Sequence, residues 1–264
     1  MAADLSQFIR NLLCIGFFSS GLYMVCATEL TSDDFYERER VQEIRLSISG
    51  LNLAKMKEAL PERKYVPATL HWRNIRLENV GVRYKGNSSS RPHQSHKRGY
   101  LIKVNEFKKG TRFLKLRRIA LDNGVQFGSL FSEPIVTDIL RDLNVPASRF
   151  NYANLFINDD YQGVYGNVER IDESFIKRHF GSKKGLLYKV HMGGPGANFS
   201  YEGNDPAQYK KGFEPKNEAA EKSFDKLIDF IKKIDKDGKS NYEQMLSENL
   251  RLENFLKITA AMLF

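Results

Sequence analysis

The feature that most constrains the fold is a change of hydrophobic period near residue 170. Before this point, apolar and polar residues alternate as they do in half-buried strands. The strands predicted there are residues 43–48, 80–84 and 100–104. After it, residues 218–234 have the spacing of an amphipathic helix with Phe224, Leu227, Ile228 and Ile231 on one face. The sequence therefore predicts an α+β chain that is sheet-rich first and helical afterwards.

Three further elements are predicted around this change. Residues 132–143 predict a helix with Ser132 as its N-cap and an apolar face made by Ile135, Ile139 and Leu143. A hairpin is predicted from residues 152–157 and 163–168, joined by the turn-rich residues 158–162. A short helix over residues 173–180 follows.

The N-terminal segment has the pattern of a signal peptide over residues 1–27. Arg10 precedes an apolar stretch at residues 12–25, which is shorter than the roughly 20 residues needed to span a membrane. Val25-Cys26-Ala27 offers a small-residue cleavage site, so we expect a secreted or cell-envelope protein that touches membrane only through this segment. The alternative is an uncleaved anchor or a buried helix. Both cysteines, Cys14 and Cys26, lie in the segment, so a mature chain would have no disulfide.

Charge favours anionic partners without selecting one. The 264 residues hold 41 Lys and Arg against 32 Asp and Glu, a net charge of +9. Lysines scattered over solvated helix faces would give the same total. Nucleic acid is therefore supported by charge alone, and the predicted export argues against it.

Most signatures of enzyme sites are absent from the sequence. It has no GxGxxG, P-loop, HExxH or serine nucleophile elbow. His93 and His96 lie in a basic loop without carboxylates, which favours solvated histidines over a metal site. Residues 235–238 have the wrong glycine spacing for a calcium loop and are expected to end a helix.

One constellation has the composition of a phosphate site. Gly86, Asn87, Ser88 and Ser89 follow a predicted strand, and Lys97 and Lys103 come next. Backbone N–H groups and hydroxyls of such a loop can bind phosphate oxygens, while a lysine from an adjacent strand supplies positive charge. The alternative is an ordinary polar hairpin loop.

Four segments together resemble the CotH family of spore-coat kinases. They are VGVRYKGNSSSR, KRGYLIKVNEF, LNVPASRFNYANLFINDDYQGVYGNVERIDESFIKRHFG and GLLYK. The resemblance implies an atypical protein-kinase fold, with a sheet-rich N-terminal lobe over residues 40–170 and a helical C-terminal lobe over residues 171–264. It implies ATP with Mg or Mn as the cofactor and phosphorylation of Ser or Thr in secreted, coat or cell-surface proteins. In some relatives it implies host-cell adhesion.

The resemblance also implies roles for single residues. Gly86, Asn87, Ser88 and Ser89 match the family's glycine-asparagine-serine motif, and Lys97 and Lys103 match its two recurrent lysines. Lys103 is favoured as the phosphate lysine, although both lysines share a face if one unbroken strand holds them.

Two carboxylates complete the expected nucleotide site. Glu133 corresponds to an acidic residue that would pair with the phosphate lysine, or it is a carboxylate favoured at a helix N-terminus. Glu169 and Asp172 lie where a connection between lobes would hold adenine, or they form a solvated turn and an N-cap.

The family's catalytic and metal-binding aspartates come after the point where this sequence ends. The apolar and uncapped segment at residues 252–264 further suggests a truncated C-terminal lobe, or else a terminal helix docked on the body. The resemblance therefore implies a chain that does not transfer phosphate alone. The second functional class is a secreted adhesion or coat module that acts without catalysis.

Overall fold

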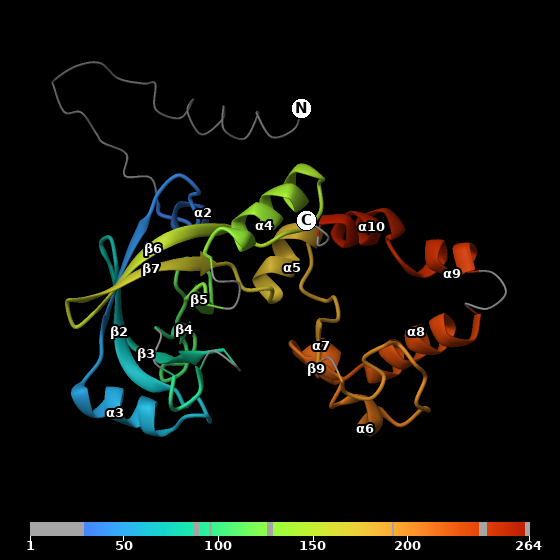
Figure 1. Ribbon diagram of the computed structural model, residues 1–264, viewed down its shortest axis with the longest axis horizontal. Coiled ribbons are helices and arrows are strands. Elements are labelled where there is room, and N and C mark those ends of the chain that lie inside the picture. Colours follow the sequence, from blue (N-terminus) through green and yellow to red (C-terminus); the bar gives the residue numbers. More distant parts are fainter. Residues whose placement is uncertain are drawn as a thin grey trace, which may run out of the picture. The chain divides into compact units, whose positions relative to one another are not determined.

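The chain is described by a computed structural model over residues 29–86, 90–94, 97–125, 129–191, 193–237 and 242–261. Within these residues, seven strands form one closed sheet in the order β1-β2-β3-β4-β5-β7-β6 (Figure 1). The strands are β1 (Gln42–Ser47), β2 (Val66–Trp72), β3 (Ile75–Lys85), β4 (Gly99–Lys103), β5 (Arg118–Asp122), β6 (Phe150–Ile157) and β7 (Asp160–Val168). The predicted signal peptide lies outside the described residues.

Helices interrupt and follow the barrel. They are α2 (Ser32–Phe35), α3 (Gly50–Glu58), α4 (Ser132–Asp142), α5 (Glu173–Phe180), α6 (Pro206–Tyr209), α7 (Glu218–Glu221), α8 (Phe224–Asp237), α9 (Tyr242–Asn249) and α10 (Leu252–Ala261). Two short strands, β8 (Tyr188–Val190) and β9 (Phe213–Pro215), pair with each other. In the part of the chain that the structure describes, no helix is long and apolar enough to cross a membrane.

The barrel closes through one parallel contact. Strand β1 pairs antiparallel with β2, but it pairs parallel with β6, with Ile44 opposite Leu155. The other neighbouring strands of the barrel are antiparallel. Because the sheet is closed, it has no free edge strand.

Alternation fills the barrel interior with apolar side chains. Those with no more than 1% exposure include Ile44, Leu46, Leu70, Trp72, Val80, Val82, Ile102, Ile119, Leu121, Ala153 and Leu155. A buried polar network lies among them, in which Asn167 donates to Asn151 at 2.9 Å and Trp72 donates to Gln42 at 2.9 Å. Asn151 also donates to the backbone of Phe35 at 3.0 Å, so the network fixes α2 against the barrel.

The predicted hairpin is confirmed, with a tighter turn than expected. Strands β6 and β7 are joined by Asn158 and Asp159, which have φ values of 52° and 67°. Two successive left-handed residues make the primed turn that matches the twist of paired strands. Of the other residues of the predicted loop, Asp160 and Tyr161 pair with β6, and the register shift between Leu155 and Phe156 takes up Gln162.

Two predictions about the helices are wrong in detail. Helix α4 has Phe131 at its N-cap without a side-chain cap, and Ser132 is already helical. Its predicted apolar face is not buried, since Ile135 is 56% exposed. The helix predicted over residues 218–234 is divided into α7 and α8, because α7 ends at Lys222.

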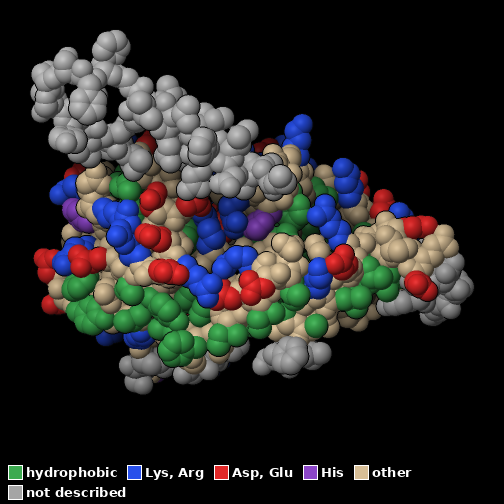
Figure 2. Space-filling model, turned by 90° about the horizontal axis from the view of Figure 1, so that it is seen from above, with side chains coloured by type: hydrophobic (Ala, Val, Ile, Leu, Met, Phe, Trp, Pro, Cys, Tyr) green, Lys and Arg blue, Asp and Glu red, His purple; other side chains and the backbone are tan. Residues whose placement is uncertain are grey.

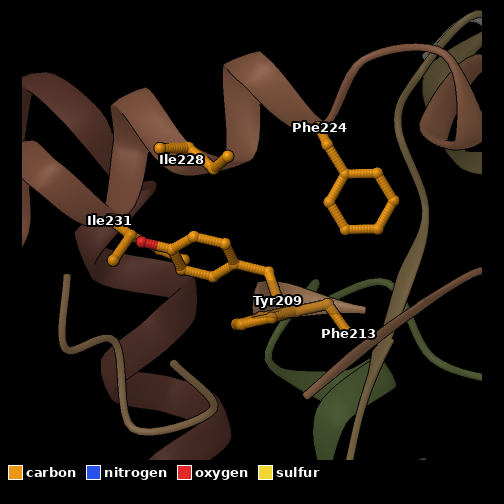
Figure 3. Packing of buried hydrophobic residues seen from close by; sticks show 5 residues of the cluster. All are labelled: Tyr209, Phe213, Phe224, Ile228 and Ile231. Atoms are coloured by element: carbon orange, nitrogen blue, oxygen red, sulfur yellow. The ribbon is translucent and has the colours of Figure 1, made fainter. Parts of the chain in front are cut away.

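The apolar stripe of α8 does pack as its spacing predicts. A separate cluster contains Tyr209, Phe213, Phe224, Ile228 and Ile231, each no more than 6% exposed (Figure 3). The Tyr209 hydroxyl donates to the Gly203 carbonyl at 2.9 Å and accepts from the Glu202 N–H at 2.8 Å. Burial of its ring therefore leaves no polar group of this side chain without a partner.

Helix α10 contacts α4. Lys257 donates to the carbonyl of Leu143 at 3.1 Å, which satisfies an acceptor just after the end of α4. Phe255 and Leu256 are 52% and 56% exposed. Figure 2 shows one face of the molecule, on which acidic and basic side chains are interspersed and hydrophobic side chains gather along one edge.

Candidate anion-binding site on the outer face of the barrel

The register of β3, β4 and β5 places charged side chains in rows on the outer face of the barrel. Val82, Ile102 and Ile119 are fully buried inside, so their neighbours in sequence point outward. Lys103 lies opposite Gly81 on β3 and Arg118 on β5, which makes one row.

Two further rows follow along the strands. Next to the basic row comes a mostly apolar one, in which Leu101 lies opposite Arg83 and Ala120. A third row begins with Lys85 opposite Gly99 and ends with Asp122 opposite Gly166. Rows on one face of a strand are about 7 Å apart, so two rows with charged groups flank a middle row in which Arg83 is the charged residue.

The first row belongs to a basic cluster, which we define as Arg83, Lys103, Arg118 and Arg170. Arg170 follows the end of β7, and its Nε is buried without a hydrogen-bond partner. Burial lowers the pKa of Arg170, and the positive charges of Arg118 and Arg83 lower it further, although Asp172 and Tyr65 oppose them. The cluster therefore holds like charges close together, which is unfavourable unless an anion joins them.

Few acidic groups offset this cluster. Lys103 pairs with Glu106 at 2.5 Å, and its ammonium lies 5.8 Å from the ring of Tyr65. The guanidinium of Arg83 lies 5.2 Å from the same ring. Among the described residues, no carboxylate forms an ion pair with Arg118.

Lys85 of the third row lies near two carboxylates, which are Asp122 in the same row and Glu133 on α4. Lys85 forms an ion pair with Asp122, whose Oδ1 also accepts from the N–H of Gly124 at 2.9 Å. Burial alone would raise the pKa of Asp122, but the hydrogen bond and charge of Lys85, the N–H of Gly124 and the charge of Lys97 together outweigh burial and lower the pKa. Burial raises the pKa of Glu133, and the charge of Asp122 raises it further, while Lys85 opposes both.

The two predicted phosphate lysines lie on different faces. Strand β4 begins at Gly99, so Lys97 lies before the strand. The two lysines are therefore not held by one unbroken strand, which was the condition for a shared face. The Lys97 ammonium donates to the carbonyl of Val164 and lies 4.5 Å from the centre of the Tyr165 ring. Tyr165 is 1% exposed and belongs to the inner face. Only Lys103 lies in the outer basic cluster.

Among the described residues, the expected ion pair between Lys103 and Glu133 is not found. Lys103 pairs with Glu106 three residues along the chain, and the lysine that affects Glu133 is Lys85. Glu133 also lies in the first turn of α4, as its alternative interpretation predicted. Of the predicted loop, Gly86 has a φ of 108° and its carbonyl accepts from Arg63 at 2.7 Å. Asn87, Ser88 and Ser89 lie outside the described residues.

Glu169 is the centre of a buried ion cluster. It is 4% exposed, and its carboxylate accepts from Nη2 of Arg149 at 2.7 Å, from the Arg149 backbone at 3.0 Å and from Arg178. Burial alone would raise the pKa of Glu169, but the bonds from Arg149 and Arg178 outweigh it and hold the pKa below its ordinary value. Asp172 caps α5 by accepting from the N–H of Ser174 at 2.8 Å.

Sequence reasoning missed Lys85, Asp122, Arg118 and Arg170 as site residues. Lys85 directly precedes the glycine loop and alternates with Arg83, which was the available signal for an outward-facing pair. Arg118 and Asp122 lie at the two ends of a strand that was not predicted. Within the described ranges, no three His, Cys, Asp or Glu side chains are grouped so that they could hold a metal ion.

Comparison with known proteins identifies the family of this chain. The sequence profile described as CotH kinase protein matches residues 82–264, which is more than half of the chain and includes the whole basic cluster. The chain belongs to the CotH kinase protein family. The resemblance noted in the sequence is thereby confirmed.

A curated CotH relative is the inner spore coat protein H of Bacillus subtilis (strain 168). It is 23% identical over 224 residues, which cover 83% of this chain and 59% of that protein. The chain thus spans less than two thirds of the length of this relative.

Proposed function

We propose that this chain is the nucleotide-binding part of a CotH-family protein kinase and that the basic cluster binds the phosphates of ATP. One observation carries the proposal: the buried Nε of Arg170 has no hydrogen-bond partner, although the positive charges of Arg118 and Arg83 lie close to it. An unpaired buried donor and clustered like charges are both costly. A polyanion that accepts from these arginines would remove both costs.

The residues of the outer face fit phosphates by their chemistry. Guanidinium groups can donate two parallel hydrogen bonds to phosphate oxygens, which suits Arg118 and Arg170. Lys103 supplies a point charge on the neighbouring strand, as its resemblance to a recurrent family lysine implies. Lys85 lies two rows away beside Asp122 and Glu133, where it can orient a second part of the ligand.

The kinase-like arrangement is part of this proposal. A sheet-rich part precedes Glu169, α4 carries Glu133, and a mainly helical part follows, which is the order of parts in protein-kinase lobes. When bound, ATP with Mg or Mn supplies the phosphoryl group that is transferred. The residues of this chain bind the phosphates and hold them against the barrel. By analogy with the relative's name, the acceptor would be a coat, secreted or cell-surface protein.

The test is calorimetric titration of the 264-residue chain with ATP and magnesium. Arg118→Gln should weaken binding about tenfold or more, since a hydrogen bond to a charged group contributes roughly 1.5–3 kcal/mol. Arg76→Gln is the matched control, because Arg76 is also on a barrel strand but is exposed and paired with Glu78. It should bind ATP as the unchanged chain does.

A second variant guards against an effect on folding. Lys103→Gln removes the neighbouring charge and should weaken ATP binding in the same direction, with far-UV circular dichroism unchanged in both variants. Absence of saturable ATP binding by the unchanged chain would contradict the proposal and favour an adhesion or coat module. Equal loss in Arg76→Gln would show that net charge alone attracts ATP.

A further inference from the structure

A cavity of about 500 Å³ lies on the inner side of the same strands. Three of its lining residues are the tyrosines Tyr84, Tyr100 and Tyr165, whose rings form a chain with centroids 5.5 and 6.0 Å apart. Tyr84 and Tyr100 alternate along β3 and β4 with the outward-facing Lys85 and Lys103. The cavity is therefore separated from the basic cluster by the thickness of the sheet.

The lining of this cavity is basic and has no carboxylate. Lys57 on α3, Lys97 and Arg98 bring three cations to it, and no Asp or Glu is among its lining residues. The Arg98 guanidinium lies 5.2 Å from the Tyr84 ring, and the Lys97 ammonium lies over Tyr165. Among the described residues, none of these three cations forms an ion pair with a carboxylate.

Two donors of the lining are left without partners. Nε2 of Gln94 and Nη1 of Arg98 are buried and make no hydrogen bond. The opposite ends of both side chains are occupied, since Gln94 Oε1 accepts from the Arg91 N–H at 3.2 Å and Arg98 Nη2 donates to the Arg91 carbonyl at 2.8 Å. Buried donors usually have partners, so these two point to an acceptor that the cavity takes up.

We infer that this cavity is a second binding site, distinct from the ATP site, which takes a phosphomonoester. Three cations and two free donors match a dianion with several acceptor oxygens better than a carboxylate with a single charge. The tyrosine rings then contact the carbon skeleton that carries the phosphate. A cavity of this volume is in the range of small-ligand sites.

Two sources of phosphomonoester are separated by the choice of probes. The chain is titrated with O-phosphoserine as a free small molecule and with a short peptide that contains phosphoserine in its interior. Serine and the unphosphorylated peptide are the matched controls. Saturable binding of either phosphorylated probe supports the site, and the tighter of the two identifies the source.

Variants on one helix test where the probe binds. Lys57→Gln removes a charge from the cavity, while Lys55→Gln makes the same change two residues away at an exposed position outside the lining. Lys57→Gln should weaken binding of the phosphorylated probe about three- to tenfold, as expected for loss of one charge-assisted contact. Lys55→Gln should not change it.

The outer-face variant separates this inference from the proposed ATP site. Arg118→Gln should leave phosphomonoester binding intact even if it abolishes ATP binding, because Arg118 lies on the other face of the sheet. Three results would overturn the inference: no saturable binding of any phosphorylated probe, equal loss in Lys55→Gln and Lys57→Gln, or loss in Arg118→Gln. Each can occur whether or not ATP binds.

Discussion

At the residue scale, the two carboxylates Glu169 and Glu133 differ in whether their charge stabilises the fold. Glu169 is buried with both oxygens occupied by Arg149 and Arg178, so it is a structural ion cluster. Glu133 is partly buried, its pKa is raised by burial and by the charge of Asp122, and the charge of Lys85 opposes this rise. The folded chain therefore stabilises the ionised form of Glu169 and destabilises the ionised form of Glu133.

Replacement of Glu169 should therefore be strongly destabilising. Glu169→Ala leaves Nη2 of the largely buried Arg149 guanidinium without its carboxylate, although Nη1 keeps its pair with Asp33, and breaking a buried pair costs about 3 kcal/mol or more. Because the folded-state pKa of Glu169 is lowered, its contribution is complete above the ordinary pKa of 4.5 and is lost as pH falls through the folded-state value.

Thermal unfolding across pH measures this contribution. The difference in Tm between the unchanged chain and Glu169→Ala should be full at pH 7 and should shrink below pH 4.5. Glu218→Ala, which removes an exposed carboxylate paired with Lys222, serves as the control and should leave Tm unchanged. A pH-independent difference would contradict this assignment.

Glu133 should show the opposite sign. Its folded-state pKa is raised, so the ionised carboxylate opposes folding above that value, and this cost disappears as pH falls toward the ordinary pKa of 4.5. Glu133→Gln should raise the urea midpoint at pH 7, and the gain should vanish in acid. A Glu133→Gln variant that is less stable than the unchanged chain at pH 7 would contradict the raised pKa of Glu133.

The sequence identified part of this residue-scale chemistry. It singled out Lys103, Glu133 and Glu169, but it could not assign their partners, because pairing depends on strands and helices that meet only in the folded chain. Lys103 was expected to reach α4, and instead it pairs locally with Glu106. Arg170 was missed because nothing in its local sequence shows that its Nε is buried.

At the element scale, the turn between β6 and β7 also holds the end of β1. The Asn158 side chain accepts from the N–H of Ile48 at 2.8 Å and donates to its carbonyl at 2.7 Å. Asn158 has a φ of 52°, in the left-handed region that asparagine tolerates. One residue therefore shapes the hairpin and ties it to the strand that closes the barrel.

Two substitutions separate these roles. Asn158→Ala loses both hydrogen bonds and places a less suitable residue in a left-handed conformation, so urea unfolding should show a loss of about 2 kcal/mol. Asn158→Gly relieves the backbone strain but not the loss of the bonds, and it should be less destabilising than alanine. Glycine as destabilising as alanine would mean that the turn conformation contributes nothing.

Elements with strong alternation were predicted, and weaker ones were not. The hairpin and the inner strands have clear period-two patterns, whereas β2 contains Pro67, which argues against a strand. Strand β5 is five residues long and its apolar centre fits helix and strand equally. Helix α3 buries only Met56, so its periodicity carries little signal.

At the scale of the whole molecule, barrel closure creates two different surfaces on the same strands. The parallel pairing of β1 with β6 joins residues more than a hundred positions apart, and local periodicity cannot foresee such a contact. Once the sheet closes, alternation places basic residues outside and tyrosines inside. The two proposed sites therefore share β3 and β4 without sharing side chains.

If the basic cluster binds the phosphates of ATP, comparing ATP with adenosine, which carries no phosphate, tests this most directly. The affinities of both compounds are measured calorimetrically for the unchanged chain and for Arg118→Gln, at one magnesium and salt concentration. We expect the unchanged chain to prefer ATP, and we expect this preference to fall about tenfold or more in Arg118→Gln. An ATP-to-adenosine affinity ratio that is the same in both proteins would contradict phosphate binding by the cluster.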